Sequence, residues 1–317
     1  HFTGPNAPGI SSDELELLKN RVEALKSHPA ILAWYLCDEP RGAKKIEALK
    51  KVYELLREVD PYHPCVVLNN SVDGCLDIQD AGDILYPDIY PNFKEKGGSV
   101  SSLSVISNSV KAIYRGSGGF KPVIFAAQTF DYGAYYSPEL YRAPDYEEVR
   151  GMIYLAIVSN IKGLVNFKIG EHDWREKGFS EKSAGIYATK SLSTGMLEGL
   201  GPEIGFLTGV FTAPPSTIKV EVKSKDILFM TRTTEKGGLY IICVNQSDKT
   251  VHTEISVLDN GIERLNVFPE GREVVLENNK FHDGFAPYEA HVYTTDSKLP
   301  GIKTVREIKN IISGAKD

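Results

Sequence analysis

The chain has 317 residues, of which 42% are hydrophobic and 25% charged, and its formal net charge is -6. This composition is typical of a folded globular protein and excludes a largely disordered chain. The negative charge, without clusters of lysine and arginine between aromatic residues, argues against a nucleic-acid-binding surface. No apolar run approaches the roughly 20 residues that cross a bilayer, so we expect no membrane partner.

The four cysteines form no CxxC pair and show no Cys/His spacing typical of a metal site. Three of them, Cys37, Cys65 and Cys243, lie in or beside apolar runs that read as strands. We therefore expect buried free thiols, with a disulfide between Cys65 and Cys75 as the alternative.

Helical and strand-like segments alternate from Ser12 to Thr212. Residues 12–26 form an amphipathic pattern that predicts a helix capped by Ser12, and residues 43–59 predict a second helix. The predicted strands cover residues 31–37, 65–68, 83–90, 123–127 and 163–169, and further helices cover residues 103–114, 145–161 and 183–200. Such alternation is typical of an α/β fold with a parallel sheet, here about five βα units of a (β/α)8 TIM-barrel-type module.

The pattern changes after Ala213-Pro214-Pro215. Several short segments alternate apolar and polar residues between turns rich in glycine and asparagine, which is typical of an antiparallel β-sandwich. These segments are residues 219–222, 227–233, 239–245, 251–257, 273–276 and 290–294. We therefore predict a barrel-type domain over residues 1–212 and a β-sandwich domain over residues 213–317, with a lysine-rich tail that is either a short helix or frayed.

Two adjacent carboxylates, Asp38 and Glu39, directly follow the apolar run of residues 31–37. A run this apolar predicts a strand buried on both faces, and sites of parallel α/β folds lie at the carboxyl ends of the strands. The alternative for Asp38 is that it caps a helix opened by Pro40. Glu39 is a poor N-cap, so it is the better candidate for chemistry.

The segment Trp34-Tyr35-Leu36-Cys37-Asp38-Glu39-Pro40 resembles the fourth strand of glycoside hydrolases of the large retaining (β/α)8-barrel clan. That strand typically ends in Asn-Glu, and the resemblance implies that Glu39 is the general acid/base. Asp38 replaces the asparagine, and a carboxylate can accept but not donate a hydrogen bond to a sugar hydroxyl. The later strands then fall in register as strands five to eight of the barrel, so the first strands are expected to be absent.

The clan's nucleophile is a glutamate that ends strand seven, where this chain has Gln128. An amide cannot supply the negative charge that attacks the sugar carbon or stabilises an oxocarbenium-like centre. Asp88, Glu171, Asp173 and Asp131 are the candidates for the second carboxylate. We favour Glu171, because the neighbouring Trp174 would offer a face on which a sugar ring stacks, although a polar loop without a catalytic role explains the segment equally well.

The sequence therefore predicts a site that cleaves or binds a neutral oligosaccharide or glycoside, without a cofactor or a metal. Glu39, Glu171 and Asp88 are the candidate catalytic residues. Asp38, Tyr90, Gln128, Asn69, Tyr132 and Trp174 are the candidate substrate-binding residues. Two alternatives stay open: a carbohydrate-binding relative that has lost catalysis, and a barrel fragment that lacks its N-terminal segment and pairs with itself or another chain.

Overall fold

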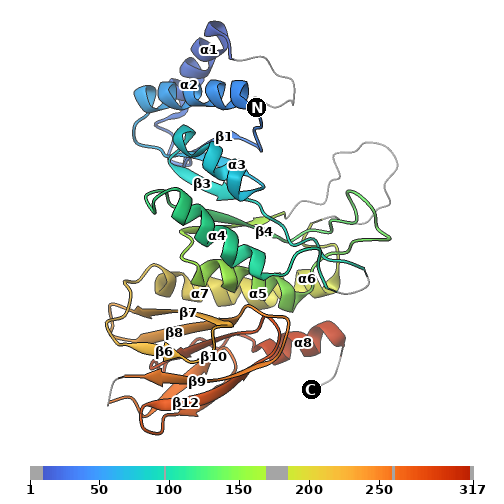
Figure 1. Ribbon diagram of the computed structural model, residues 1–317, viewed down its shortest axis with the longest axis vertical. Coiled ribbons are helices and arrows are strands. Elements are labelled where there is room, and N and C mark those ends of the chain that lie inside the picture. The colour runs from blue at the N-terminus through green and yellow to red at the C-terminus, as the bar shows by residue number, and fades with distance from the viewer. Residues whose placement is uncertain (1–9, 96–97, 169–184, 259–260, 315–317) are drawn as a thin grey trace. The chain divides into compact units, whose positions relative to one another are not determined.

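The computed structural model describes residues 10–95, 98–168, 185–258 and 261–314 (Figure 1). By its internal contacts the chain divides into two compact units. Unit 1 consists of His1–Tyr90, Asn108–Ala126 and Ile161–Val165, and unit 2 consists of Pro91–Ser107, Ala127–Asn160 and Asn166–Asp317. Of the described residues, none belong to a helix that is both long and apolar enough to cross a membrane.

Three parallel strands form the sheet of unit 1, in the order β1 (Trp34–Cys37), β2 (Cys65–Asn69) and β3 (Ile84–Pro87). A parallel bridge between Leu85 and Val123 leads from β3 toward β4 (Ile124–Gln128), which pairs with β5 (Gly163–Phe167). All five predicted strands are present. Three of these strands end at predicted site residues or directly before them: Cys37 precedes Asp38, Pro87 precedes Asp88, and β2 ends at Asn69 itself.

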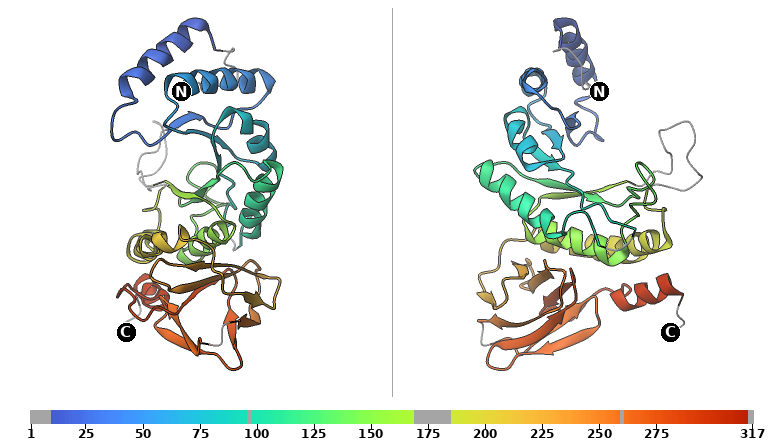
Figure 2. Two further views of the ribbon diagram at one scale, coloured as in Figure 1. Left: turned by 90° about the vertical axis from the view of Figure 1, so that its left-hand side faces the viewer. Right: turned by 45° about the vertical axis from the view of Figure 1, so that its right-hand side comes forward.

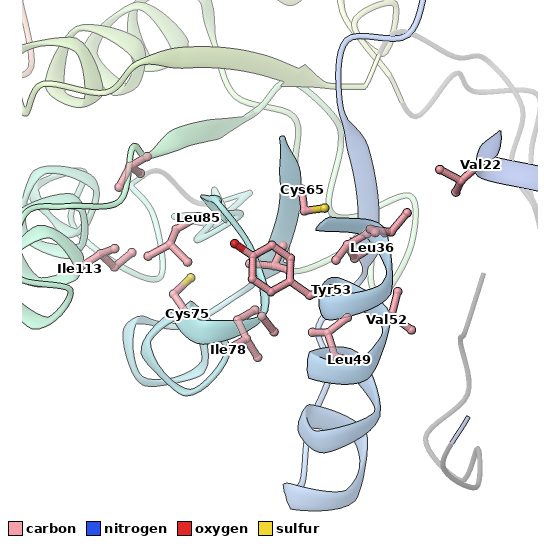
Figure 3. Close-up of a cluster of buried hydrophobic side chains, with 14 of the residues drawn as sticks. Val22, Leu36, Leu49, Val52, Tyr53, Cys65, Cys75, Ile78, Leu85 and Ile113 are labelled. Carbon is pink, nitrogen blue, oxygen red and sulfur yellow. The ribbon is translucent and has the colours of Figure 1, made fainter. Parts of the chain in front are cut away.

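Four helices bury apolar residues in one cluster with this sheet. They are α1 (Ser12–Leu25), α2 (Ala43–Val59), α3 (Val72–Asp77) and α4 (Ser104–Gly116). Helix α5 (Tyr146–Val158) belongs to unit 2 and is buried along most of its length. Figure 3 shows Leu49, Val52 and Tyr53 of α2 beside Leu36 and Cys65 of the sheet, in one buried cluster. Removal of this apolar surface from water is the main stabilising contribution to unit 1.

Three local expectations need correction. Ser11, not Ser12, caps α1, in a capping box with Glu14. The predicted helix over residues 183–200 does not end at 200: α6 (Lys190–Thr194) and a π-type segment (Gly195–Leu200) lead into α7 (Gly201–Phe211). Cys65 and Cys75 are free thiols, as are Cys37 and Cys243, so the alternative of a disulfide is wrong.

Strand β1 is not buried on both faces, as its apolar sequence predicts. Tyr35 is 47% exposed and Leu32, just before the strand, is 85% exposed. The reason is its place at one end of the three-stranded sheet, where, among the residues that the structure describes, it pairs only with β2. An apolar run alone does not distinguish an edge strand from a central one.

Two antiparallel sheets follow the parallel part (Figures 1 and 2). One has the order β11-β10-β13-β8-β7 and the other β12-β9-β6, and both contribute to one apolar core. Their strands are β6 (Val220–Val222), β7 (Ile227–Thr233), β8 (Leu239–Asn245), β9 (Val251–Val257), β10 (Arg264–Phe268), β11 (Arg272–Val275), β12 (Lys280–Phe285) and β13 (Ala290–Thr294). The C-terminal helix α8 (Val305–Ser313) begins at a capping box of Thr304 and Glu307. The predicted fold class, parallel α/β units followed by antiparallel sheets, is confirmed.

Candidate functional site

Glu39 follows the end of β1 in a backbone conformation that side chains rarely adopt, with φ at 43°. The left-handed region costs an L-residue on the order of 1–2 kcal/mol, so the surrounding structure must hold it there. Such strained residues cluster at functional sites. The helix that follows does not explain the acids: α2 begins at Ala43 and is capped by Gly42, so the alternative that Asp38 is its N-cap is wrong.

The carboxylate of Glu39 is held by two side chains of unit 1. Nδ2 of Asn70 donates a hydrogen bond of 2.6 Å to Oε2 of Glu39. The guanidinium of Arg41 lies 3.5 Å from the same oxygen and donates to Oδ1 of Asn70 at 3.4 Å. Asn70 directly follows β2, so the central strand of the sheet fixes an acid carried by its neighbour.

Asp88 follows the end of β3 and is only 7% exposed. Its backbone N–H donates to the carbonyl of Asn69 at 3.4 Å, and its carboxyl group lies close enough to Glu39 to interact with it. Burial, followed by the negative charge of Glu39, raises the pKa of Asp88 to about 7. Asp88 therefore stays partly protonated at neutral pH, because a buried carboxyl group beside another acid resists ionisation.

Tyrosine side chains and Asp38 surround this acid pair. The rings of Tyr35 and Tyr86 meet edge to face with centroids 6.3 Å apart. Burial, followed by the charges of Asp88 and Asp38, raises the pKa of Tyr86 to about 12, and burial beside Asp88 also raises the pKa of Tyr90. These phenols are therefore neutral donors at physiological pH.

Asn69 supports the backbone of the site. Its side chain is 2% exposed, and Nδ2 donates to the carbonyl of Pro40 at 3.2 Å. The structure thus brings together Asp38, Glu39, Asn69, Asp88 and Tyr90 of the predicted site residues. Asn70, which contacts Glu39 directly, is not among the candidate substrate-binding residues, although its position after a predicted strand places it at the same rim as Asn69.

Gln128 and Tyr132 belong to unit 2. Gln128 is fully buried at the end of β4, and its Oε1 accepts the backbone N–H of Asn92 at 3.0 Å. Tyr132 stacks on Tyr136 with ring centroids 4.4 Å apart and meets Tyr141 edge to face. The two remaining predicted residues, Glu171 and Trp174, lie outside the described residues. Within the described ranges, no group of three or more potential ligands could hold a metal ion.

Solved structures of glycoside hydrolases share this fold. A structure described as a glycoside hydrolase matches with a TM-score of 0.56 and 15% identity over 92% of this chain and 70% of that chain. An α-amylase from Geobacillus thermoleovorans, complexed with acarbose, matches with a TM-score of 0.55 and 9% identity over 90% of this chain and 65% of that chain. AmyP in complex with maltose matches with a TM-score of 0.54 and 9% identity over 93% of this chain and 70% of that chain.

The chain therefore has a glycoside hydrolase barrel-type fold followed by a C-terminal β-domain, as the resemblance of residues 34–40 implies. It spans about 65% of the length of the Geobacillus α-amylase. No family model matches the chain, and neither does any curated protein sequence.

Proposed function

We propose that this chain is a glycoside hydrolase whose acid/base chemistry is carried by Glu39 and Asp88. The observation that carries the proposal is that the two acids are neighbours at the carboxyl ends of β1 and β3, where burial and then the charge of Glu39 raise the pKa of Asp88. Glycoside hydrolysis needs one carboxyl group that holds a proton for the leaving oxygen and one that is ionised. Asp88, with a pKa of about 7, meets the first need, and Glu39 is the candidate for the second.

Within this pair, Asp88 fits the general acid. Its pKa of about 7 keeps a large share of the carboxyl group protonated at neutral pH. Glu39 accepts a hydrogen bond from Asn70 and faces Arg41, which suits an ionised carboxylate acting as base or nucleophile. This assignment reverses the role of Glu39 that the resemblance implies.

A neutral oligosaccharide is the proposed substrate class. Tyr35 and Tyr86 present an edge-to-face aromatic pair beside the acids, and the apolar faces of sugar rings pack on such surfaces. Asp38 is exposed and accepts hydrogen bonds from hydroxyl groups. The acarbose and maltose of two structures with the same fold belong to the same ligand class. Tyr90, Asn69, Gln128, Tyr132 and Trp174 complete the proposed binding residues, and Glu171 is the rival for the second carboxylate.

Three substitutions test the proposal on a panel of aryl glycosides and oligosaccharides. We expect Glu39→Gln and Asp88→Asn each to lower kcat about 10²–10⁴-fold, the range of general acid–base catalysis. Glu54→Gln, at an exposed position of α2, is the matched control and should leave turnover unchanged. Full activity in Asp88→Asn together with a large loss of activity in Glu171→Gln would identify Glu171, and not Asp88, as the second catalytic carboxyl group.

One observation favours a second candidate, a carbohydrate-binding protein without turnover. Gln128 is an amide, fully buried and bonded to the backbone of Asn92, so it supplies no charge at the position of the clan's nucleophile. Under this alternative, no member of the panel is cleaved, yet an oligosaccharide raises the Tm. Tyr35→Ala should then abolish the thermal shift, whereas turnover by the unmodified chain would reject the alternative.

We also propose that the boundary between the barrel-type domain and the β-sandwich domain falls near Thr212. The last helix before it, α7, ends at Phe211, and the first antiparallel strand, β6, begins at Val220. Limited proteolysis tests this division. Cleavage that accumulates between residues 212 and 219 supports it, and first cleavage inside α7 or β6 contradicts it.

A further inference from the structure

Buried polar atoms that lack a hydrogen-bond partner are concentrated around the end of β4. In the part of the chain that the structure describes, six buried side-chain nitrogen or oxygen atoms have no such partner. Five of them belong to unit 2, on Asn92, Gln128, Thr129, Tyr135 and Asn166, and none belongs to the described residues from 185 onward. Folded proteins leave few buried polar groups unpaired, so their concentration in one region indicates a ligand that pairs with them.

Contacts between these residues bring them to the ends of two paired strands. Asn166 lies in β5, which pairs with β4, and the backbone N–H of Thr129 donates to the carbonyl of Phe167 at 2.9 Å. Phe130 connects Tyr135 to the same strand end, because its ring meets the rings of Tyr135 and Phe167 edge to face at 5.5 and 5.7 Å. The carboxyl ends of parallel strands are where α/β folds assemble their sites.

The backbone fixes the orientation of the Gln128 amide. The backbone N–H of Asn92 can only donate, so the atom of Gln128 that it meets at 3.0 Å is the oxygen, Oε1. Asn92 is itself held, because its carbonyl accepts the N–H of Val100 at 2.8 Å. The NH2 group of Gln128 therefore faces away from this bond. It is a donor on a fully buried residue, and it has no acceptor among the described residues.

Asn92 supplies the complementary atom. Its Oδ1 is buried and has no donor among the described residues, although the residue as a whole is partly exposed. Nε2 of Gln128 and Oδ1 of Asn92 thus belong to two residues joined by one hydrogen bond, yet they do not bond to each other. A group that pairs with both atoms has to accept a hydrogen bond from one and donate a hydrogen bond to the other.

We propose that Gln128 and Asn92 bind one hydroxyl group of a carbohydrate, with Nε2 of Gln128 as the donor and Oδ1 of Asn92 as the acceptor. A hydroxyl group accepts and donates at the same oxygen. A carboxylate can only accept, so it would leave Oδ1 unpaired, and an ammonium group can only donate, so it would leave Nε2 unpaired. The inference rests on the proposed function for the carbohydrate nature of the ligand. Water has the same hydrogen-bonding chemistry, and the experiment separates the two sources.

NMR of the full chain follows the side-chain amide of Gln128 directly. Its NH2 signals are assigned by their loss in Gln128→Glu, and glucose, galactose, xylose, maltose and glycerol are added in turn. We expect at least one of these compounds to shift the Gln128 signals in a saturable manner. Asn92→Gly keeps the backbone donor and removes Oδ1, so it should raise the Kd about 3–10-fold, the effect of one hydrogen bond between neutral groups. Asn92→Asp keeps an acceptor oxygen and should retain most of the affinity.

The matched control is Asn278→Gly. Asn278 has a φ of 54°, against 55° for Asn92, and it is exposed in the β-domain, so its replacement tests the effect of glycine at a left-handed position. We expect the Kd of this variant to equal that of the unmodified chain. Circular dichroism establishes that each variant is folded. Asn92→Ala, with Asn278→Ala as its control, carries the test if Asn92→Gly does not fold.

The inference is overturned if no compound shifts the Gln128 signals, or if Asn92→Gly binds as tightly as the unmodified chain. It is also overturned if a long-lived water molecule, detected by an NOE to the Gln128 NH2 group, stays in place when the sugar binds. A shift of the Gln128 signals in a chain without turnover supports the inference and rejects the proposed function. Turnover without such a shift supports the proposed function and rejects the inference.

Discussion

The carboxyl groups of Glu39 and Asp88 interact with each other, although β2 separates the strands that carry them. The end of that central strand bridges the two positions. Asn69 accepts the backbone N–H of Asp88 and donates to the carbonyl of Pro40, while Asn70 donates to Glu39. Folding of the parallel sheet is therefore sufficient to bring the two acids into contact.

This pairing makes the stability of the chain depend on pH. Asp88 has a pKa of about 7 in the folded state and an ordinary value near 4 when unfolded. Between these values the folded state binds more protons than the unfolded state, so stability falls as pH rises from about 4 to 7. We expect Asp88→Asn to gain on the order of 2–4 kcal/mol relative to the unmodified chain between pH 4.5 and pH 8.

Urea unfolding at both pH values measures this gain. Asp73→Asn, at an exposed position of α3, serves as the control and should follow the unmodified chain. A constant difference between Asp88→Asn and the unmodified chain across this range would show that Asp88 is ionised in the fold.

A buried ion pair in unit 2 predicts a large loss of stability on substitution. Arg150 and Glu203, 4% and 1% exposed, meet at 2.7 Å, and Tyr154 donates to the same carboxylate oxygen at 2.5 Å. Replacement of one partner leaves the other charge buried without compensation, so Arg150→Met should cost about 3–5 kcal/mol. The double variant Arg150→Met/Glu203→Leu should recover part of this loss in urea unfolding.

An exposed ion pair provides the contrast. Lys280 and Glu254 lie 3.0 Å apart, but the lysine is 50% exposed. Lys280→Met should therefore change stability by no more than about 1 kcal/mol. Equal losses in Arg150→Met and Lys280→Met would contradict the importance of burial.

His291 should make the β-domain less stable at alkaline pH. Burial alone would lower the pKa of this imidazole, but hydrogen bonds to Asp283 and Glu289 outweigh it and raise the pKa above 6.5. Stability from this group is complete below about pH 6.5 and is lost as pH rises through the folded-state value. We expect His291→Gln to unfold earlier than the unmodified chain at pH 6, with a smaller difference at pH 9. Thermal unfolding at the two pH values is the measurement, and a difference that grows with pH would refute the charged state.

The outer edge of β1 predicts self-association. In the described part of the chain, β1 pairs with β2 alone, and Tyr35 and Leu32 beside it are exposed. Unpaired edge strands take up further strands. We expect sedimentation velocity to show concentration-dependent dimers, and Tyr35→Lys to weaken them. A compact monomer at all concentrations would remove the alternative of a barrel that closes with a second copy.

Local patterns were sufficient to predict the alternation of parallel strands and helices, and β7, β8, β9 and β13 begin and end at the predicted residues. They failed for α3, β10 and β12. In β12, His282-Asp283-Gly284 breaks the apolar alternation, and the strand is stabilised instead by its pairing with β9. A six-residue helix such as α3 is too short for a helical period.

The site was predictable only where chain order dictated it. Glu39 and Asp88 were identified because both lie at the ends of predicted strands, and parallel strands end at one edge of a sheet. Their proximity, and the contact of Asn70 with Glu39, depend on the register of three strands and on a left-handed backbone at Glu39. The spacing of apolar residues in the sequence predicts neither the register of the strands nor the backbone conformation at Glu39.

The close approach of α3 to the end of β2 restricts which changes this region tolerates. A Cβ atom at Gly74 would overlap with the side-chain amide of Asn69, the group that anchors Pro40 next to Glu39. A methyl group at this position of the helix would thus displace the buried amide of Asn69 and, through Pro40, disturb the position of Glu39. Libraries that diversify α3 to obtain new specificities should therefore retain glycine at this position, whereas the exposed Asp73 and Asp77 are free for variation.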